Sequence, residues 1–481
     1  MAKSRPLTFL DLLLVLVVLG TAAGARTWYL LSYTPGSDAS PNAVLQVQGR
    51  GTLAADGKTE WESLVASMKE NGVVEGYRGQ PLFAAGPEKT AHLAPGFALF
   101  RWCLEYQVAE TIGMNPASVL RWTHLGLGSL TAALYFLIAR RTFQSTLIGL
   151  LAGLATALHP YWIINMAELE DGTLVTFLLA VTLWLGIRGG QQGGAVTSLL
   201  YGLFLAALAL TRAGLLPFAF VGLLWFLWQC RYHAQGWLCA IVAFLGFSIG
   251  LSSWTVRNLQ TFGEPMPIVS SAWLHTWIGN NPQATGGPFT PEMERTLSAQ
   301  RLQALRSDLF KTSQTRRYGE LRQEVWSELQ HNPLSTLSRR AHALKYFFLG
   351  AEQPTHAGIM HSEDALASFK EESDRKNFQL FVEDARGCLA WTLFGMLLLA
   401  FLGWRWSFAW KSSALLAVAI LWIPLPYLLT HAGNGHGLRL PMDGPLLCLA
   451  MYALVCLIPG VGYQYLKGEA QNRGSTTTSA A

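Results

Sequence analysis

Residues 7–31 read LTFLDLLLVLVVLGTAAGARTWYLL, an apolar run that follows Lys3 and Arg5. A bilayer core needs about 20 apolar residues to be crossed by a helix, so this run predicts a first transmembrane helix. A cleaved signal peptide is the alternative, because Ala22-Ala-Gly-Ala25 resembles a processing site. Under either interpretation, residues 35–116 lie outside the cytoplasm.

The composition of the whole chain supports a membrane protein. Hydrophobic residues make up 51% of the 481 residues and charged residues only 14%, whereas a soluble domain carries about 25% charged residues. The net charge is +5, but the basic residues stand mostly in short runs between apolar segments, which is typical of cytoplasmic loops rather than of nucleic-acid binding. The six cysteines form no CxxC pair, so neither a disulfide framework nor a zinc site is indicated.

Apolar segments recur along the chain and predict an all-α polytopic membrane protein of about ten spans. Short basic runs such as Arg140-Arg141 separate alternate segments, and the positive-inside rule places those runs and both chain ends in the cytoplasm. The predicted spans are 7–31, 118–139, 146–166, 172–185, 196–210, 215–228, 237–256, 388–402, 414–429 and 440–459.

The spans divide the chain into six regions. These are a first transmembrane helix (1–34), an exterior catalytic loop with juxtamembrane helices (35–116), a transmembrane bundle (117–256), an exterior helical region (257–386), C-terminal transmembrane helices (387–467) and a disordered tail (468–481). The tail is polar and rich in Ser and Thr, a composition that does not bury a core.

The first exterior loop holds the candidate catalytic residues, Asp56 and Glu60. Apolar residues recur at helical spacing from Trp61 to Met68 and predict a helix that ends at Asn71-Gly72. A carboxylate beside a membrane surface can act as a general base. At a helix start, however, the same carboxylates also complement the helix dipole, and both interpretations stay open.

Further polar residues fall in the loops on the same predicted side. The acids around Asp171 are either a solvated helix end or functional, and Arg212 either snorkels or binds an anion. Cations on this face would hold an anionic leaving group. The candidate substrate-binding residues are Lys89, His92, Glu170, Asp171, Arg212, Arg257, Asn280, Asn281, His436 and Arg439.

The second exterior region contains two predicted amphipathic helices, at about 291–330 and 333–348. The second helix carries Arg339, Arg340, His342 and Lys345. It either lies along lipid headgroups or presents a solvated basic face, and the solvated face is the favoured interpretation.

Several motifs together resemble the membrane-embedded glycosyltransferases of the GT-C class, specifically the bacterial relatives of protein O-mannosyltransferases and of the lipid A aminoarabinose transferase (glycosyltransferase family 39-like). The motifs include Lys89-Thr-Ala-His-Leu-Ala-Pro95, Trp254-Thr-Val-Arg-Asn258, Trp277-Ile-Gly-Asn-Asn-Pro282, Ala284-Thr-Gly-Gly287 and Leu438-Arg-Leu-Pro441. The adjacent Asp-Glu of that family is missing, because the corresponding positions are Gly57 and Lys58. Asp56 and Glu60 flank the place, and Asp38 is a third candidate.

The resemblance implies a GT-C-like bundle and a transferase that faces the outside of a bacterial inner membrane. Its donor would be a polyprenyl-phosphate-linked sugar and its acceptor an unidentified lipid, glycan or protein. A carboxylate, Asp56 or Glu60, would activate the acceptor for an inverting single displacement. No cofactor is implied, although carboxylates and histidines would suit a divalent metal. The alternatives are a lipid-linked saccharide transporter or flippase and a catalytically inactive GT-C-like assembly protein.

Overall fold

The computed structural model describes most of the apolar segments and parts of the loops between them. The described residues are 6–33, 60–79, 88–167, 170–231, 235–287, 314–349, 373, 376–377, 393–407, 409–431 and 439–460. Asp38, Asp56 and His436 lie outside them, as do residues 461–481.

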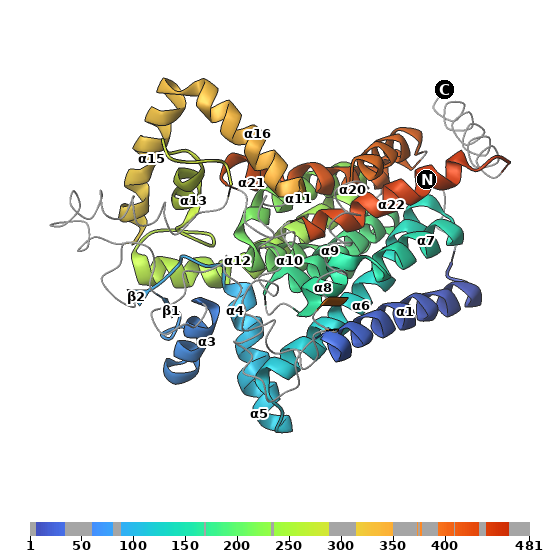
Figure 1. The fold of residues 1–481 in the computed structure, drawn as a ribbon, viewed down its shortest axis with the longest axis horizontal. Helices are drawn as coiled ribbons and strands as arrows, with labels where there is room; N and C mark the ends of the chain where they lie inside the picture. The colour runs from blue at the N-terminus through green and yellow to red at the C-terminus, as the bar shows by residue number, and fades with distance from the viewer. Residues whose placement is uncertain are drawn as a thin grey trace.

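A bundle of long apolar helices forms the body of the molecule (Figure 1). Seven helices are long and apolar enough to cross a membrane within the described residues, and a bent pair, Thr146–Ala157 with Pro160–Met166, makes up to eight. Two shorter apolar helices, Ala195–Thr211 and Leu393–Trp406, correspond to the other two predicted spans. The predicted all-α polytopic membrane protein is thus confirmed.

The bundle helices begin and end close to the predicted spans. They are α1 (Phe9–Tyr33), α6 (Pro116–Phe143), α7 (Thr146–Ala157), α8 (Pro160–Ala167), α9 (Gly172–Gln192), α10 (Ala195–Thr211), α11 (Leu216–Cys230), α12 (Gly236–Phe262), α20 (Trp410–Trp422), α21 (Leu425–Leu429) and α22 (Leu440–Leu457). A 3₁₀ turn, η2 (Ala213–Leu215), precedes α11. Since α12 runs to Phe262, its helix continues past residue 257, where the sequence analysis begins the second exterior region.

Local sequence explains where α6 begins. Pro116, the first helical residue, has no backbone N–H to satisfy. Asn115 precedes it, and its side-chain oxygen accepts a hydrogen bond from the Ala117 N–H at 2.9 Å, as an N-cap residue does.

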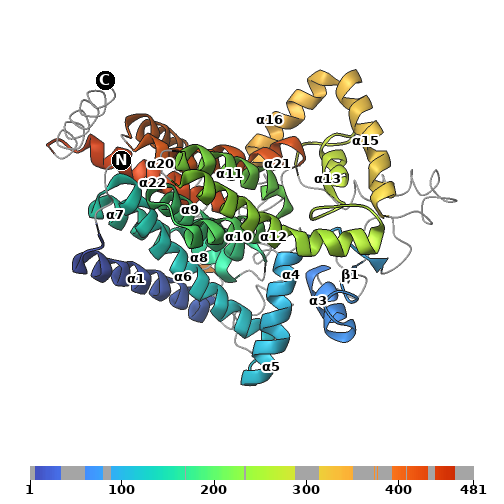
Figure 2. The same cartoon turned by 180° about the vertical axis from the view of Figure 1, so that it is seen from behind.

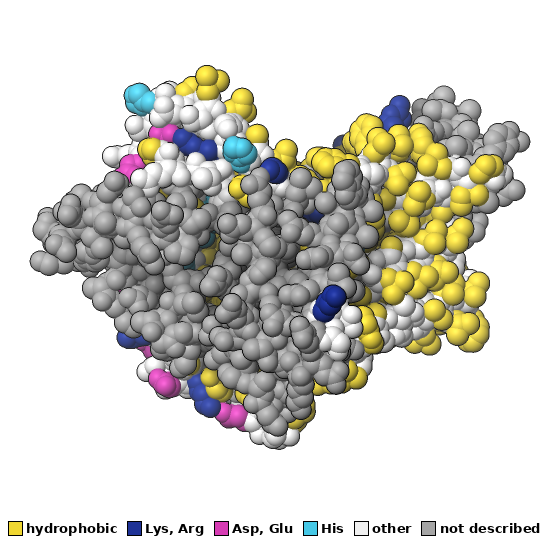
Figure 3. Space-filling model, in the orientation of Figure 1, with side chains coloured by type: hydrophobic (Ala, Val, Ile, Leu, Met, Phe, Trp, Pro, Cys, Tyr) yellow, Lys and Arg dark blue, Asp and Glu magenta, His cyan; other side chains and the backbone are white. Residues whose placement is uncertain are grey.

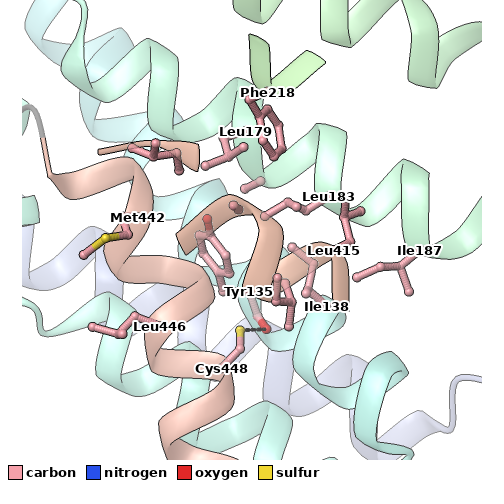
Figure 4. Packing of buried hydrophobic residues seen from close by; sticks show 14 of the residues in the cluster. Tyr135, Ile138, Leu179, Leu183, Ile187, Phe218, Leu415, Met442, Leu446 and Cys448 are labelled. Carbon is pink, nitrogen blue, oxygen red and sulfur yellow. Dashed lines mark hydrogen bonds between the residues drawn. The ribbon is translucent and has the colours of Figure 1, made fainter. Parts of the chain in front are cut away.

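The helices differ in how much of their surface the protein itself covers. In the apolar, membrane-crossing part of each helix, the buried share of the residues is 83% in α22 and 78% in α9, but only 22% in α1 and 28% in α12. Figure 4 shows the central packing, where Cys448 of α22 lies against α6, with its Sγ 3.9 Å from the Tyr135 carbonyl oxygen. The apolar residues that α1 and α12 leave exposed are therefore the ones available to lipid.

Polar contacts join the predicted cytoplasmic loops at one end of the bundle. Arg140 forms an ion pair with Asp11 of α1 at 2.7 Å. Arg141 Nε donates to Gln191 at 2.8 Å, and the Gln191 side-chain amide donates to the Ser412 hydroxyl at 3.0 Å. The ends of α6 and α9 and the starts of α1 and α20 thus lie together, as the predicted alternation requires.

The opposite end of the bundle carries a lobe of smaller elements, on the left in Figure 1 and on the right in Figure 2. The lobe contains α3 (Glu60–Asn71), the antiparallel strands β1 (Arg78–Gly79) and β2 (Glu88–Lys89), α4 (Pro95–Trp102), a π-helical turn η1 (Cys103–Val108), α5 (Ala109–Ile112), α13 (Ala272–Gly279), α15 (Gln314–His331) and α16 (Pro333–Leu349).

Helix α3 confirms the predicted helix of the first exterior loop. Leu64, Val65 and Met68 are buried against Tyr77 and Ala98. The helix ends at Asn71, and Gly72 follows with a φ of +81°. A glycine takes up this left-handed conformation without the steric cost of a side chain, which is why the Asn71-Gly72 signal was informative.

Candidate functional site

Arg257 connects α12 to the loop that carries α3, β1 and β2. Its guanidinium donates to the Thr90 carbonyl at 2.9 Å and to the Tyr77 carbonyl at 3.3 Å. The same group lies over the rings of Tyr77 and Trp254, at 5.3 Å and 4.9 Å from their centroids. Arg257 is only 5% exposed, so in this structure it orders the loop rather than presenting a charge to solvent.

Lys89 stands at the edge of this loop, on β2. Its ammonium group forms an ion pair with Glu75 at 2.7 Å, and the two side chains are 36% and 62% exposed. The hydrogen bond from Lys89, together with its charge, lowers the pKa of Glu75 below its ordinary value. Because solvent reaches both partners, the pair contributes little to stability.

Three histidines from separate segments form a column beside this loop. His92 stacks on His275 with ring centroids 6.0 Å apart, and His275 stacks on His431 at 5.5 Å. The facing nitrogens, His275 Nδ1 and His431 Nε2, are 3.2 Å apart. One of the two must donate a proton and the other accept it, so the contact needs at least one neutral ring.

Partial removal from water favours the neutral form of two of these histidines. Desolvation lowers the pKa of His92 to about 4 and that of His275 to about 4, and the neighbouring His92 lowers the pKa of His275 further. At neutral pH these rings are therefore uncharged, and they are available as hydrogen-bond partners rather than as cations.

Asn280 and Asn281 close the end of α13. The Asn280 side chain donates to the Thr276 and Leu429 carbonyls and accepts from Arg340 at 2.7 Å. Asn281 donates to the Trp277 and Ile278 carbonyls and accepts from the Gln283 N–H. Both side chains are almost fully buried, and in this structure their hydrogen bonds go to the protein itself.

Asp171 and Arg212 form a two-pronged pair between the start of α9 and the end of α10. Arg212 Nε donates to one carboxylate oxygen at 2.9 Å, and Nη2 donates to the other at 2.7 Å. The Arg212 side chain is 10% exposed and the Asp171 side chain is 15% exposed. Glu170 lies near enough to add its negative charge to the field at Arg212, and the two acids raise the pKa of Arg212.

Arg439 belongs to a buried cluster at the start of α22. It forms an ion pair with Asp443 at 3.1 Å and donates to the Phe348 carbonyl at 2.7 Å. His159 Nε2 lies 3.6 Å from the same Asp443. The cluster joins α22 to the break between α7 and α8, where the two helices bend by 51°.

The two predicted catalytic acids fall at the edge of what the structure describes. Glu60 is the first residue of α3, but its side chain lies outside the described residues, as does all of Asp56. Within the described part of the chain, no group of three or more His, Cys, Asp and Glu residues is arranged to hold a metal ion.

The structure adds residues that the sequence analysis did not single out. Glu75 pairs with Lys89, His275 joins His92 to His431, and Asp443 binds Arg439. A histidine within the apolar run Trp273-Leu-His-Thr-Trp277 was the available signal for His275. No local pattern identifies Glu75 as the partner of Lys89 or Asp443 as the partner of Arg439. Glu75 is separated from Lys89 in the sequence, and Asp443 lies inside the apolar helix α22.

No protein-family profile and no curated protein sequence matches this chain. Three solved structures align with most of it. The first is oligosaccharyltransferase AglB from Archaeoglobus fulgidus in complex with an inhibitory peptide and a dolichol-phosphate, with 11% identity over 93% of this chain and 50% of that chain and a TM-score of 0.46. The second is an Archaeoglobus fulgidus oligosaccharyltransferase in the apo form, with 11% identity over 95% of this chain and 52% of that chain and a TM-score of 0.48. The third is ArnT from Cupriavidus metallidurans bound to undecaprenyl phosphate, with 12% identity over 92% of this chain and 76% of that chain and a TM-score of 0.29. The chain spans about half the length of the two oligosaccharyltransferases. With TM-scores below 0.5, these similarities do not decide the family or the activity.

Proposed function

We propose that this protein transfers a sugar from a polyprenyl-phosphate-linked donor to an acceptor at the lobe-bearing face of the membrane. The observation that carries the proposal is the column of His92, His275 and His431. It brings together three loops that the sequence assigns to the same exterior face, at the end of an apolar bundle. The motifs that resemble GT-C glycosyltransferases lie in these loops or, for Trp254–Asn258, at the adjoining end of α12. The acids and cations of this region suit an acid–base reaction on a lipid phosphate.

The predicted phosphate ligands differ in the free energy that it costs to break the contacts they already make within the protein. A phosphate that binds Arg212 has to displace Asp171 from a largely buried pair, and leaving such a charge unpaired costs about 3–5 kcal/mol. Arg257 and Arg439 are likewise engaged with buried protein groups. A phosphate that binds Lys89 has to displace only Glu75, whose side chain is exposed to solvent. Lys89 is therefore the proposed phosphate ligand, whereas the three arginines hold the loops in place.

The proposed chemistry is a single displacement at the anomeric carbon. The acceptor hydroxyl or amine attacks that carbon, its proton passes to the carboxylate of Glu60 or Asp56, and the bond to the phosphate oxygen breaks. Polyprenyl phosphate leaves as an anion, so no general acid is needed. General-base assistance contributes about 100- to 10,000-fold to the rate, and loss of the correct carboxylate should reduce transfer by a factor in that range.

The test is a transfer assay on the purified protein, with a panel of polyprenyl-phosphate sugars and mass spectrometry of the released polyprenyl phosphate. Release should fall by about 100-fold or more in Glu60→Gln or Asp56→Asn. Glu70→Gln is the matched control, because Glu70 is an exposed carboxylate at the other end of α3. Unchanged release in the Asp56→Asn, Glu60→Gln double variant would exclude both carboxylates as the base.

One observation favours the transporter alternative. The broken span at α7 and α8 lies beside the buried cluster of His159, Asp443 and Arg439, and broken helices with buried charges line substrate sites in transporters. Proteoliposomes distinguish the two functions: a transporter moves the labelled lipid-linked sugar between leaflets without releasing polyprenyl phosphate. If neither release nor movement occurs with any donor, an inactive assembly protein is left.

A further inference from the structure

The two arginines of α16 point into the protein. Arg339 is 6% exposed and forms an ion pair with Glu328 of α15. Arg340 donates to the Gly279 carbonyl at 2.6 Å and to the Asn280 side chain at 2.7 Å. These contacts hold α16 against α15 and α13. The favoured sequence interpretation, a solvated basic face, therefore does not describe these two arginines.

A stripe of leucines occupies an exposed side of α16 instead. Leu334, Leu337 and Leu344 are 82%, 67% and 44% exposed. Because each helical residue advances about 100° around the axis, these positions fall on one side of the helix. The polar residues Ser335 and His342, which are also exposed, fall beside that stripe. The outward surface of α16 is thus amphipathic, as it is in helices that lie in a membrane interface.

The C-terminal end of the stripe lies close to the apolar surface of the bundle. The C-terminal end of α16 packs on α21, where Phe347 stacks on Tyr427 with centroids 5.4 Å apart. Helix α21 ends the membrane-crossing stretch Lys411–Leu429, whose Leu421 and Leu429 are 68% and 58% exposed. Figure 3 shows hydrophobic side chains along the outer edge of α16, leading toward the large apolar surface of the bundle.

We propose that α16 is an in-plane membrane anchor, whose leucine stripe inserts into the lipid leaflet on the lobe side of the bundle. We infer that the occupant is lipid, because the stripe lies next to the exposed apolar residues of a membrane-crossing helix pair and because the polar residues Ser335 and His342 lie beside it. The anchor would fix the height of the lobe above the bilayer. The inference does not depend on transferase activity.

The test places an environment-sensitive fluorophore on the stripe. Leu337→Cys is labelled in a protein whose exposed Cys103, and Cys388, which lies outside the described residues, are replaced by Ser; the other four cysteines are buried. The labelled protein is reconstituted into lipid nanodiscs with or without lipids that carry a nitroxide on the acyl chain. Ser335→Cys is the matched control, since it is exposed on the same helix but lies away from the stripe.

The proposal expects acyl-chain nitroxides to quench the fluorophore at position 337 several-fold more than the one at 335, and aqueous iodide to quench in the opposite order. Strong iodide quenching at both positions would show that the stripe faces water and would overturn the proposal. A fluorophore at 337 shielded from both quenchers would also overturn it, because a protein surface would then cover the stripe.

Discussion

Lys89 and Arg212 show how two cations predicted to bind the same anion differ once their partners are known. Lys89 faces an exposed carboxylate, Glu75, and Arg212 faces a largely buried one, Asp171. The exposed pair can open at little cost, whereas the buried pair leaves an uncompensated charge when it is broken. We therefore expect the alanine substitution of Lys89 to impair catalysis and that of Arg212 to impair stability.

We expect Lys89→Ala to reduce kcat/KM for donor transfer by about tenfold or more, because a charge-assisted hydrogen bond to phosphate is lost, and to leave the thermal unfolding temperature nearly unchanged. Arg212→Ala should lower the free energy of unfolding by about 3–5 kcal/mol. Thermal unfolding in detergent and the transfer assay measure both effects. Wild-type kcat/KM in Lys89→Ala would rule Lys89 out as the phosphate ligand.

The two half-buried histidines, His92 and His275, predict a pH dependence of stability. The folded pKa of His92 and of His275 is about 4, below the ordinary value of 6.5. Between these values the unfolded chain binds protons that the folded protein does not, so the stability contributed by the neutral rings is present above pH 6.5 and is lost as the pH falls toward 4.

The unfolding temperature should accordingly fall between pH 6.5 and 4, and it should fall less steeply in the His92→Gln, His275→Asn double variant. His342→Gln, a change at an exposed histidine of α16, is the control and should follow the wild-type curve. A double variant with the wild-type pH profile would mean that these rings do not contribute to the acid sensitivity.

At the scale of elements, glycines set how closely the bundle helices approach. A Cβ on Gly202 of α10 would lie 1.9 Å from the Ala243 carbonyl oxygen of α12 and 2.7 Å from the Phe247 nitrogen. Those contacts are with backbone atoms, which cannot move without separating the two helices. Small residues at such crossings are a general feature of membrane helix pairs.

Gly202→Ala should therefore destabilise the protein by about 1–3 kcal/mol, the usual effect of overpacking. Gly126→Ala is a matched control within α6, because a Cβ there meets nothing within 4 Å. Alanine favours a helix over glycine by about 1 kcal/mol, so this control should be neutral or stabilising. Equal unfolding temperatures for the two variants would contradict the close α10–α12 crossing.

At the scale of the whole molecule, the predicted alternation of loops accounts for the arrangement of the bundle ends. The start of α1 and the end of α22 lie at the same end (Figure 1), where Arg140 and Arg141 make their contacts. The lobe lies at the other end. Which compartment each end faces stays a prediction of the positive-inside rule.

Cysteine labelling in intact cells tests the orientation. In a Cys103→Ser, Cys388→Ser background, Asn71→Cys at the end of α3 should react with a membrane-impermeant maleimide, and Ala195→Cys at the start of α10 should react only after the membrane is permeabilised. Both positions are exposed in the structure. The reverse pattern would invert the topology and place the proposed site in the cytoplasm.

The sequence by itself determined the properties that depend on local pattern. Apolar runs predicted the membrane helices, and the spacing from Trp61 to Met68 followed by Asn71-Gly72 predicted α3 and its end. Each of these signals is contained within one segment, because hydrophobic burial and helix termination act on neighbouring residues. Asp56, Glu60 and His436 stay predictions, because none of their side chains lies within the described residues.

Only the tertiary structure decided what the polar residues do. Arg212 meets a carboxylate 41 residues away, and His275 meets a histidine 156 residues away. Arg339 turns inward to Glu328 and leaves leucines outside. Whether a cation serves a ligand, a loop or a neighbouring helix depends on which partner lies within hydrogen-bonding distance. That partner is set by the packing of segments that are far apart in the chain, and a local sequence pattern holds no information on that packing.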